Sequence, residues 1–209
     1  MIKLIAFDMD GVLIDAKDWH YEALNKALGV FGFGISRYDH LTTYDGLPTR
    51  KKLEMLSLES GLPIALHDFI NEKKQNYTQD MVHTMCKPTF NHEYAMSNLS
   101  AKGYKIAVAS NAVRQSVDLM MEKANLSCYL DFVLSNEDVK KPKPDPEIYS
   151  TIISHFACEP EECLIIEDNE NGIRAATASG GHVMVVKDVN DVTFDNIMRR
   201  INEVEADDK

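Results

Sequence analysis

The sequence predicts an α/β fold in which a parallel β-sheet lies between layers of helices and an all-helical segment follows the first strand. Two observations predict it. Short apolar runs alternate with helical patterns from residue 88 onward, which favours a parallel sheet covered on both faces. Helical patterns alone fill residues 16–87. We therefore expect a Rossmann-like three-layer domain (residues 1–15 and 88–209) with an inserted helical cap domain (residues 16–87).

The first predicted strand spans Ile2 to Phe7, an apolar run that leads directly into two carboxylates. Asp8 and Asp10 follow it, and Gly11 then allows a sharp turn of the backbone. Like charges this close repel one another unless a cation lies between them, and a hard divalent metal ion would relieve the repulsion. The alternative is that these carboxylates only support a turn or cap a helix, as an Asp before a Gly commonly does.

Three helical patterns fill the predicted cap. The first follows Asp15, with apolar residues at three- and four-residue steps, and ends near Gly32. The second spans about residues 49–60 and stops at Gly61. The third spans about residues 65–82. No convincing strand interrupts them, which is why we interpret this stretch as a helical insertion.

Strand and helix patterns alternate in the remainder of the chain. The expected strands cover residues 105–109, 132–134, 163–166 and 183–186. The expected helices cover about residues 92–102, 114–125, 171–179 and 193–204, with one more that ends at His155. In an open parallel sheet, ligands bind beyond the carboxyl ends of the strands, so functional residues are expected there.

Composition excludes some classes of partner. The chain has 209 residues and a formal net charge of −11. Nucleic acid and anionic membranes attract basic surfaces, so neither is expected as a partner of an acidic protein. No apolar run approaches the roughly 20 residues of a membrane-spanning helix. We expect a monomer or weak dimer that binds a small molecule.

The four cysteines predict no disulfide framework. Cys86, Cys128, Cys158 and Cys163 show no CxxC pairing, and the amino terminus shows no signal-peptide pattern. We interpret the thiols as packing residues of a protein in the reduced cytoplasm.

Polar residues follow four of the predicted strands. They are Asp8 and Asp10 after the first, Ser110 and Asn111 after the second, Lys141 beyond the third, and Glu167 and Asp168 after the fourth. A parallel sheet would gather them at one edge although they are spread over 160 residues of sequence. Each group alone has a structural alternative, because the second and fourth groups precede helices and could be helix caps.

In these motifs the chain resembles the haloacid dehalogenase superfamily, in the phosphatase and phosphomutase branch with a helical cap after the first strand. The signatures are Asp8-Met9-Asp10-Gly11-Val12-Leu13-Ile14-Asp15, Ser110-Asn111, Lys141-Pro142-Lys143-Pro144-Asp145, and the stretch from Glu167 to Ala176. The resemblance covers nearly the whole chain. It supports the fold expected from the strand and helix patterns.

The resemblance implies a mechanism. Asp8 would attack phosphorus and form an aspartyl-phosphate, and Asp10 would protonate the leaving alcohol and then deprotonate water. Mg²⁺ would be held by the Asp8 carboxylate, the Asp10 backbone carbonyl and Asp168, with Glu167 acting through water or behind the ligands. Dehalogenases use the nucleophile without the second carboxylate. Asp10 therefore favours phosphate esters over carbon–halogen bonds.

The resemblance also assigns the phosphate-binding residues. Ser110 would bind a phosphoryl oxygen, helped by backbone amides near Asn111. Lys141 would neutralise charge on the phosphoryl group and on Asp8. We choose Lys141 because it matches the Lys-Pro step of the family, and we expect Lys140 and Lys143 to be solvated.

The cap is expected to select the substrate. In related caps a Gly and an Arg lie over the active site, which suggests Gly46 and Arg50 here, with Arg50 contacting a distal phosphate or hydroxyl. In a sugar-phosphate mutase of the branch, a His matching His20 contacts substrate, and a cap lysine resembles Lys73 or Lys74. For Arg50 and His20 the alternative is an ordinary surface position.

The chain departs from the family at two places near the cap. Ala16-Lys17 replace the usual Ser or Thr followed by Glu, and Pro88-Thr89 replace a Pro-Gly. The first hypothesis is a Mg²⁺-dependent phosphatase that acts on a small phosphate monoester, possibly a sugar phosphate. The alternative is a phosphomutase similar to β-phosphoglucomutase, which would return the phosphoryl group to another hydroxyl of the sugar.

Overall fold

A single parallel sheet forms the centre of the computed structural model, which describes residues 1–207. Its strands are β1 (Leu4–Phe7), β2 (Lys105–Ala109), β3 (Phe132–Leu134), β4 (Cys163–Glu167) and β5 (His182–Val185), in the order β3-β2-β1-β4-β5. Phe7 pairs with Val108 on one side and Ile166 on the other, so the ends of the three central strands lie in register. The predicted α/β fold with a parallel sheet is confirmed.

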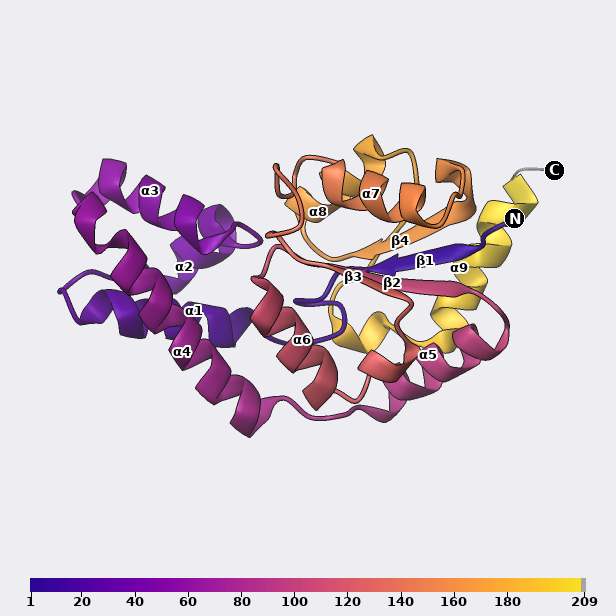
Figure 1. Ribbon diagram of the computed structural model, residues 1–209, viewed down its shortest axis with the longest axis horizontal. Helices are drawn as coiled ribbons and strands as arrows, with labels where there is room; N and C mark the ends of the chain where they lie inside the picture. The colour runs from indigo at the N-terminus through magenta and orange to yellow at the C-terminus, as the bar shows by residue number, and fades with distance from the viewer. Residues whose placement is uncertain (208–209) are drawn as a thin grey trace.

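Two helical layers cover the sheet (Figure 1). On one face lie α7 (Glu147–His155) and α8 (Glu170–Ala178), and on the other lie α5 (Phe90–Ala101), α6 (Arg114–Lys123) and α9 (Phe194–Asp207). Strand β1 contributes to both faces. Leu4 and Ala6 belong to the apolar cluster under α7 and α8, whereas Ile5 and Phe7 belong to the cluster under α5, α6 and α9. This alternation is the expected consequence of side chains pointing to opposite faces of a strand.

Residues 17–85 contain helices and turns and no strand in the structure. We call them the helical cap. Its elements are α1 (Lys17–Gly29), α2 (Arg37–Asp39), a π-helical turn (His40–Tyr44), α3 (Thr49–Ser60) and α4 (His67–Met85). In Figure 1 the cap lies beyond the tip of the β1 arrow, at the carboxyl end of the sheet. The division of the chain after residue 15 and before residue 88 stays a prediction.

The cap has its own apolar cluster, in which Leu24, Leu28, Leu53 and Leu56 are buried. Helix α3 ends as the sequence predicts, because Gly61 adopts a left-handed conformation with φ of 71°. The π-helical turn has no counterpart among the predicted elements. Short 3₁₀ turns occur at Ile64–Leu66, Ser127–Tyr129, Pro160–Glu162 and Val189–Asp191.

Two minor predictions concern packing and membranes. All four cysteines are free; Cys86 and Cys163 are buried, whereas Cys128 is exposed, so it is not a packing residue.

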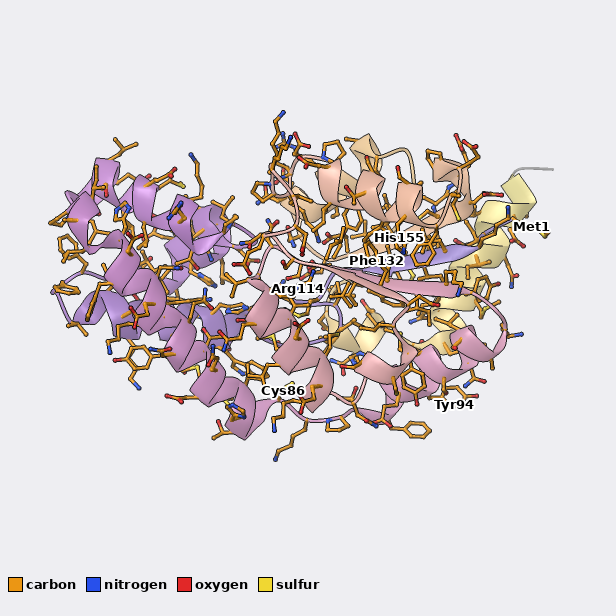
Figure 2. The ribbon with its side chains drawn as sticks, in the orientation of Figure 1. Met1, Cys86, Tyr94, Arg114, Phe132 and His155 are labelled. Carbon is orange, nitrogen blue, oxygen red and sulfur yellow. The ribbon has the colours of Figure 1, made fainter. Side chains whose placement is uncertain are left out.

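At the β3 edge the ring of Phe132 stacks on His155 with centroids 3.8 Å apart (Figure 2). Within residues 1–207, no helix has both the length and the hydropathy to cross a bilayer.

Candidate active site

Asp8 stands at the end of the central strand. Its amide donates to the carbonyl of Ile166 at 2.9 Å, which continues the β1–β4 pairing up to the carboxylate. Gly11 then turns the backbone with φ of 91°. A Cβ at this position would lie only 2.1 Å from Asp168 Oδ2, so only glycine allows the approach of Asp168 from β4. The turn therefore brings together carboxylates from two neighbouring strands.

Lys143 lies buried between two carboxylates. Its Nζ donates to Asp8 Oδ1 at 2.6 Å and to Glu167 Oε1 at 2.7 Å, and its side chain is 2% exposed. Tyr149 donates to the same Glu167 oxygen at 2.5 Å. Burial lowers the pKa of Lys143, but the charges of Asp8 and Glu167 outweigh it, and the net shift is upward. Lys143 is therefore a fixed cation in contact with the proposed nucleophile.

The prediction that Lys141 contacts Asp8 is wrong, because the lysine two residues further along takes this position. Lys141 is 73% exposed and lies 3.7 Å from Asp145, away from Asp8, whereas Lys143, expected in solvent, is buried. The path of the loop decides between them. The Lys143 amide donates to Asn111 Oδ1 at 3.0 Å, but the Lys141 amide donates to Glu147 Oε2 outside the site.

Asp10 forms a hydrogen-bonded chain with two cap residues. His20 Nε2 lies 3.1 Å from Asp10 Oδ2, and Lys74 Nζ lies 3.1 Å from His20 Nδ1. In its ammonium form Lys74 can only donate, and Nδ1 then accepts while Nε2 carries the proton that is donated to Asp10. Burial raises the pKa of Asp10, but His20 and Lys74 outweigh it and lower the pKa below its usual value. Asp10 is thus held as an oriented carboxylate.

The other cap residues predicted at the site divide into two groups. Gly46 does lie over it, because its carbonyl accepts from Asn111 Nδ2 at 2.9 Å. Arg50 is at the rim of the cavity, 79% exposed and 3.6 Å from Asp68. Lys73 points elsewhere, with its ammonium 5.5 Å from the centre of the Phe69 ring. The adjacent alternative, Lys74, is the lysine that reaches the site.

The Ser110-Asn111 pair belongs to the site and caps no helix. Ser110 is 1% exposed, and its amide donates to the carbonyl of Leu134 at 3.0 Å. Helix α6 begins after Val113, which removes the capping alternative. Asn111 donates to the carbonyls of both Gly46 and Lys143. It therefore connects the cap loop to the loop of the buried lysine.

Three carboxylates provide oxygen donors for a metal ion. Asp8, Glu167 and Asp168 each present an oxygen, and these atoms lie within 4.8 Å of one another. Glu167 does not cap α8, because the Asn169 side chain takes that role. Burial, followed by the charge of Glu167, raises the pKa of Asp8 well above its usual range. A hard divalent cation suits this all-carboxylate set and would oppose that shift.

Sequence reasoning missed Lys17. Its Nζ lies 2.6 Å from Asp168 Oδ2 and 3.8 Å from Asp45 Oδ2, so it connects the acidic cluster to the cap loop. The only signal in the sequence was that Ala16-Lys17 depart from the family pattern. Nothing in the periodicity of the first cap helix marks a residue at its start as part of a site.

One cavity of about 600 Å³ opens between the cap and the sheet edge. Asp8, Asp10 and Ser110 line it from the sheet, and His20, Lys52 and Lys74 line it from the cap. Two carboxylates, one of them bonded to a buried ammonium group, therefore face one space together with basic groups of the cap.

Comparison with known proteins shows the family. A family model described as haloacid dehalogenase-like hydrolase matches residues 5–186, and the chain belongs to this family. A phosphorylated carbohydrates phosphatase of Thermotoga maritima is 26% identical over 182 residues, 86% of this chain and 82% of that one. A phosphoglycolate phosphatase of Aquifex aeolicus is 28% identical over 179 residues, with 86% and 82% covered. The predicted membership in the phosphatase branch is confirmed.

A solved structure shares the fold over its full length. The crystal structure of β-phosphoglucomutase from Clostridium difficile superimposes with a TM-score of 0.85 at 22% identity, covering 99% of this chain and 100% of that one. At this identity the likeness concerns the fold.

Proposed function

We propose that this enzyme hydrolyses small phosphate monoesters through an aspartyl-phosphate on Asp8, with Mg²⁺ as cofactor. The contact that carries the proposal is the 2.6 Å hydrogen bond from Lys143 to Asp8 Oδ1. It orients the carboxylate at the end of the central strand and places a cation where phosphoryl charge would develop. Relatives named as phosphatases support the same class of reaction.

In the first step the Asp8 carboxylate forms a bond to phosphorus while the ester P–O bond breaks. The departing alkoxide takes a proton from Asp10. In the second step water attacks phosphorus, Asp10 accepts its proton, and inorganic phosphate leaves as Asp8 is regenerated. Asp10 must therefore alternate between protonated and ionised forms. An arriving phosphate dianion raises the pKa of a nearby carboxyl and favours the protonated form for the first step.

Two further groups would bind the phosphoryl oxygens. Ser110 is buried beside the cavity, and its hydroxyl can donate to an anionic oxygen. Lys143 can share its ammonium between Asp8 and the phosphoryl group. Asp8, the Asp10 carbonyl and Asp168 would hold Mg²⁺, which supplies charge neutralisation for phosphoryl transfer. Glu167, already bonded to Lys143 and Tyr149, would act behind these ligands.

The test is a screen of phosphorylated metabolites for phosphate release, with and without Mg²⁺. We expect release with Mg²⁺ for some esters and loss of activity in Asp8→Asn. Asp18→Asn is the matched control, because Asp18 is an exposed carboxylate that pairs with Arg37 on the cap surface. Full metal-dependent release by Asp8→Asn would refute the nucleophile, and unchanged metal dependence in Asp168→Ala would refute the metal assignment.

A phosphomutase is the second candidate, favoured by the contact between His20 and Lys74 in the cap. It would use the same aspartyl-phosphate but return the group to another hydroxyl of the sugar. Incubation with glucose 1-phosphate and a trace of glucose 1,6-bisphosphate separates the two. Conversion to glucose 6-phosphate without free phosphate would establish the mutase and exclude the hydrolase.

A further inference from the structure

The cap side of the cavity contains buried basic groups without matching acids. Lys52 and Lys74 are each 7% exposed and His40 is 2% exposed, and all three line the cavity. The carboxylates on the cap side are Asp45, which lies near Lys17, and the half-exposed Glu54. This local excess of basic groups stands in a protein whose net charge is −11.

Lys52 has no carboxylate partner. Among the side chains of residues 1–206 no acidic oxygen lies within 4.0 Å of its ammonium, whereas the buried Lys143 has two. Burial lowers the pKa of Lys52 to about 8, against the opposing charges of Asp45 and Asp10. Burying an ammonium group without a partner is costly, so the arrangement costs stability in the free protein. An anion entering the cavity would remove that cost.

His40 lies buried in the same wall. Within the described residues neither of its ring nitrogens has a hydrogen-bond partner, although the side chain is almost fully buried. Burial lowers its pKa to about 4, so the ring is neutral at pH 7 and offers one N–H donor. Burial lowers the pKa of Lys74 to about 7, and its ammonium form uses one donor on His20 and has two more. Together these groups form an incomplete anion site.

We propose that Lys52, His40 and Lys74 bind a second anionic group of the substrate, a carboxylate or a phosphate, while Asp8 acts on the phosphate ester. The proposal rests on the proposed function and narrows its substrate class to small phosphate esters that carry another acidic group. It assigns this role to Lys52 in place of Arg50, because Arg50 is exposed at the rim.

The decisive experiment compares substrates that differ in the second anion. Phosphoglycolate is paired with 2-hydroxyethyl phosphate, and fructose 1,6-bisphosphate with fructose 6-phosphate, so that the carboxylate and the phosphate are tested separately. We expect kcat/KM to be about tenfold or more higher for the diacid of at least one pair, mainly through KM, as a charged hydrogen bond provides. In Lys52→Met that preference falls toward one, and Lys52→Arg retains it.

Lys73→Met is the matched control, because it removes the same charge one position before Lys74 but outside the cavity. We expect it to keep the preference. Thermal unfolding provides a readout independent of turnover: Lys52→Met should raise Tm in buffer without substrate, since it removes an uncompensated buried charge. A variant that fails to fold is replaced in the comparison by Lys52→Gln.

A binding measurement separates failure of this inference from failure of the proposed function. Calorimetry on Asp8→Asn with phosphoglycolate and 2-hydroxyethyl phosphate reports the second-anion site without catalysis. Equal affinities for both, unchanged by Lys52→Met, overturn the inference even if phosphate is released from many esters. Tighter binding of the diacid, lost in Lys52→Met, supports it even if no ester in the screen is hydrolysed.

Discussion

The sheet edge and the helical cap both bury lysines, but the two lysines differ in their contacts with carboxylates. Lys143 at the sheet edge contacts two carboxylates at 2.6 and 2.7 Å, whereas Lys52 in the cap contacts none among the side chains of residues 1–206. Paired charges fix the orientation of the reacting groups before a substrate arrives. An unpaired charge leaves its partner to be supplied by the substrate. Under our proposals, the chemistry belongs to the sheet edge and the choice of substrate to the cap.

The largest loss of activity and stability is expected at the sheet edge, on substitution of Lys143. Lys143→Met leaves Asp8 and Glu167 facing each other without their cation, so phosphate release should fall by about 10²–10³-fold. The free energy of unfolding should fall by about 3–5 kcal/mol, as for other buried pairs that lose one partner. Steady-state phosphate assays and urea denaturation measure the two effects. Lys141→Met is the control, and a reversed order of the two variants would contradict the assignment.

A pH effect on stability is expected from the cap. The pKa of His40 is about 4 in the fold and near 6.5 in the unfolded chain, so between these values only the unfolded chain binds the proton. Stability is therefore full above pH 6.5 and decreases as pH falls toward 4, by about 3 kcal/mol. Urea denaturation between pH 4 and 7 measures it, and His40→Leu should flatten the profile. An unchanged slope in that variant would place the titrating group elsewhere.

The link between the two regions is tested at His20. His20→Ala removes the donor to Asp10, so kcat should fall by about 10–100-fold. The pKa of Asp10 should rise, because the hydrogen bond from His20 that helps to lower it is gone, and the corresponding limb of the pH–rate profile should move to higher pH. His83→Ala, an exposed position on α4, serves as control. A loss of rate without any movement of the profile would indicate a purely structural role.

The smallest effect is expected on Mg²⁺ affinity when Lys17 is replaced. Lys17 competes for Asp168 at 2.6 Å, so Lys17→Met should bind Mg²⁺ about tenfold more tightly, equivalent to about 1.4 kcal/mol. Calorimetric titration with Mg²⁺ measures this without substrate. Lys26→Met is the control, since its ammonium lies over the Tyr77 ring in the cap. Weaker Mg²⁺ binding in Lys17→Met would show that Lys17 supports the site instead.

Sequence patterns predicted the fold well because each strand and helix depends on local periodicity and on glycine stops such as Gly61. They failed to identify the buried lysine of the loop after β3, because two of its residues are equivalent in sequence. Lys141-Pro142 and Lys143-Pro144 are alike in sequence, and only tertiary contacts to Asn111 turn Lys143 inward. The choice between Lys73 and Lys74, which are neighbours on α4, could have been predicted from the sequence.

Periodicity could have identified the cap lysine. Along α4 the buried positions are Ile70, Lys74, Thr78 and Val82, at steps of four. Lys74 lies on this inward stripe and Lys73 does not. Lys17 had no such signal, because its role depends on Asp168, which lies 151 residues further along the chain.

Asn111 joins two loops that belong to different regions of the molecule. Its side chain donates to the carbonyl of Gly46 in the cap and also holds the backbone of Lys143 on both sides. An outward movement of the cap loop would break the first of these bonds. Asn111 therefore couples the position of the cap loop to the backbone that places Lys143 against Asp8.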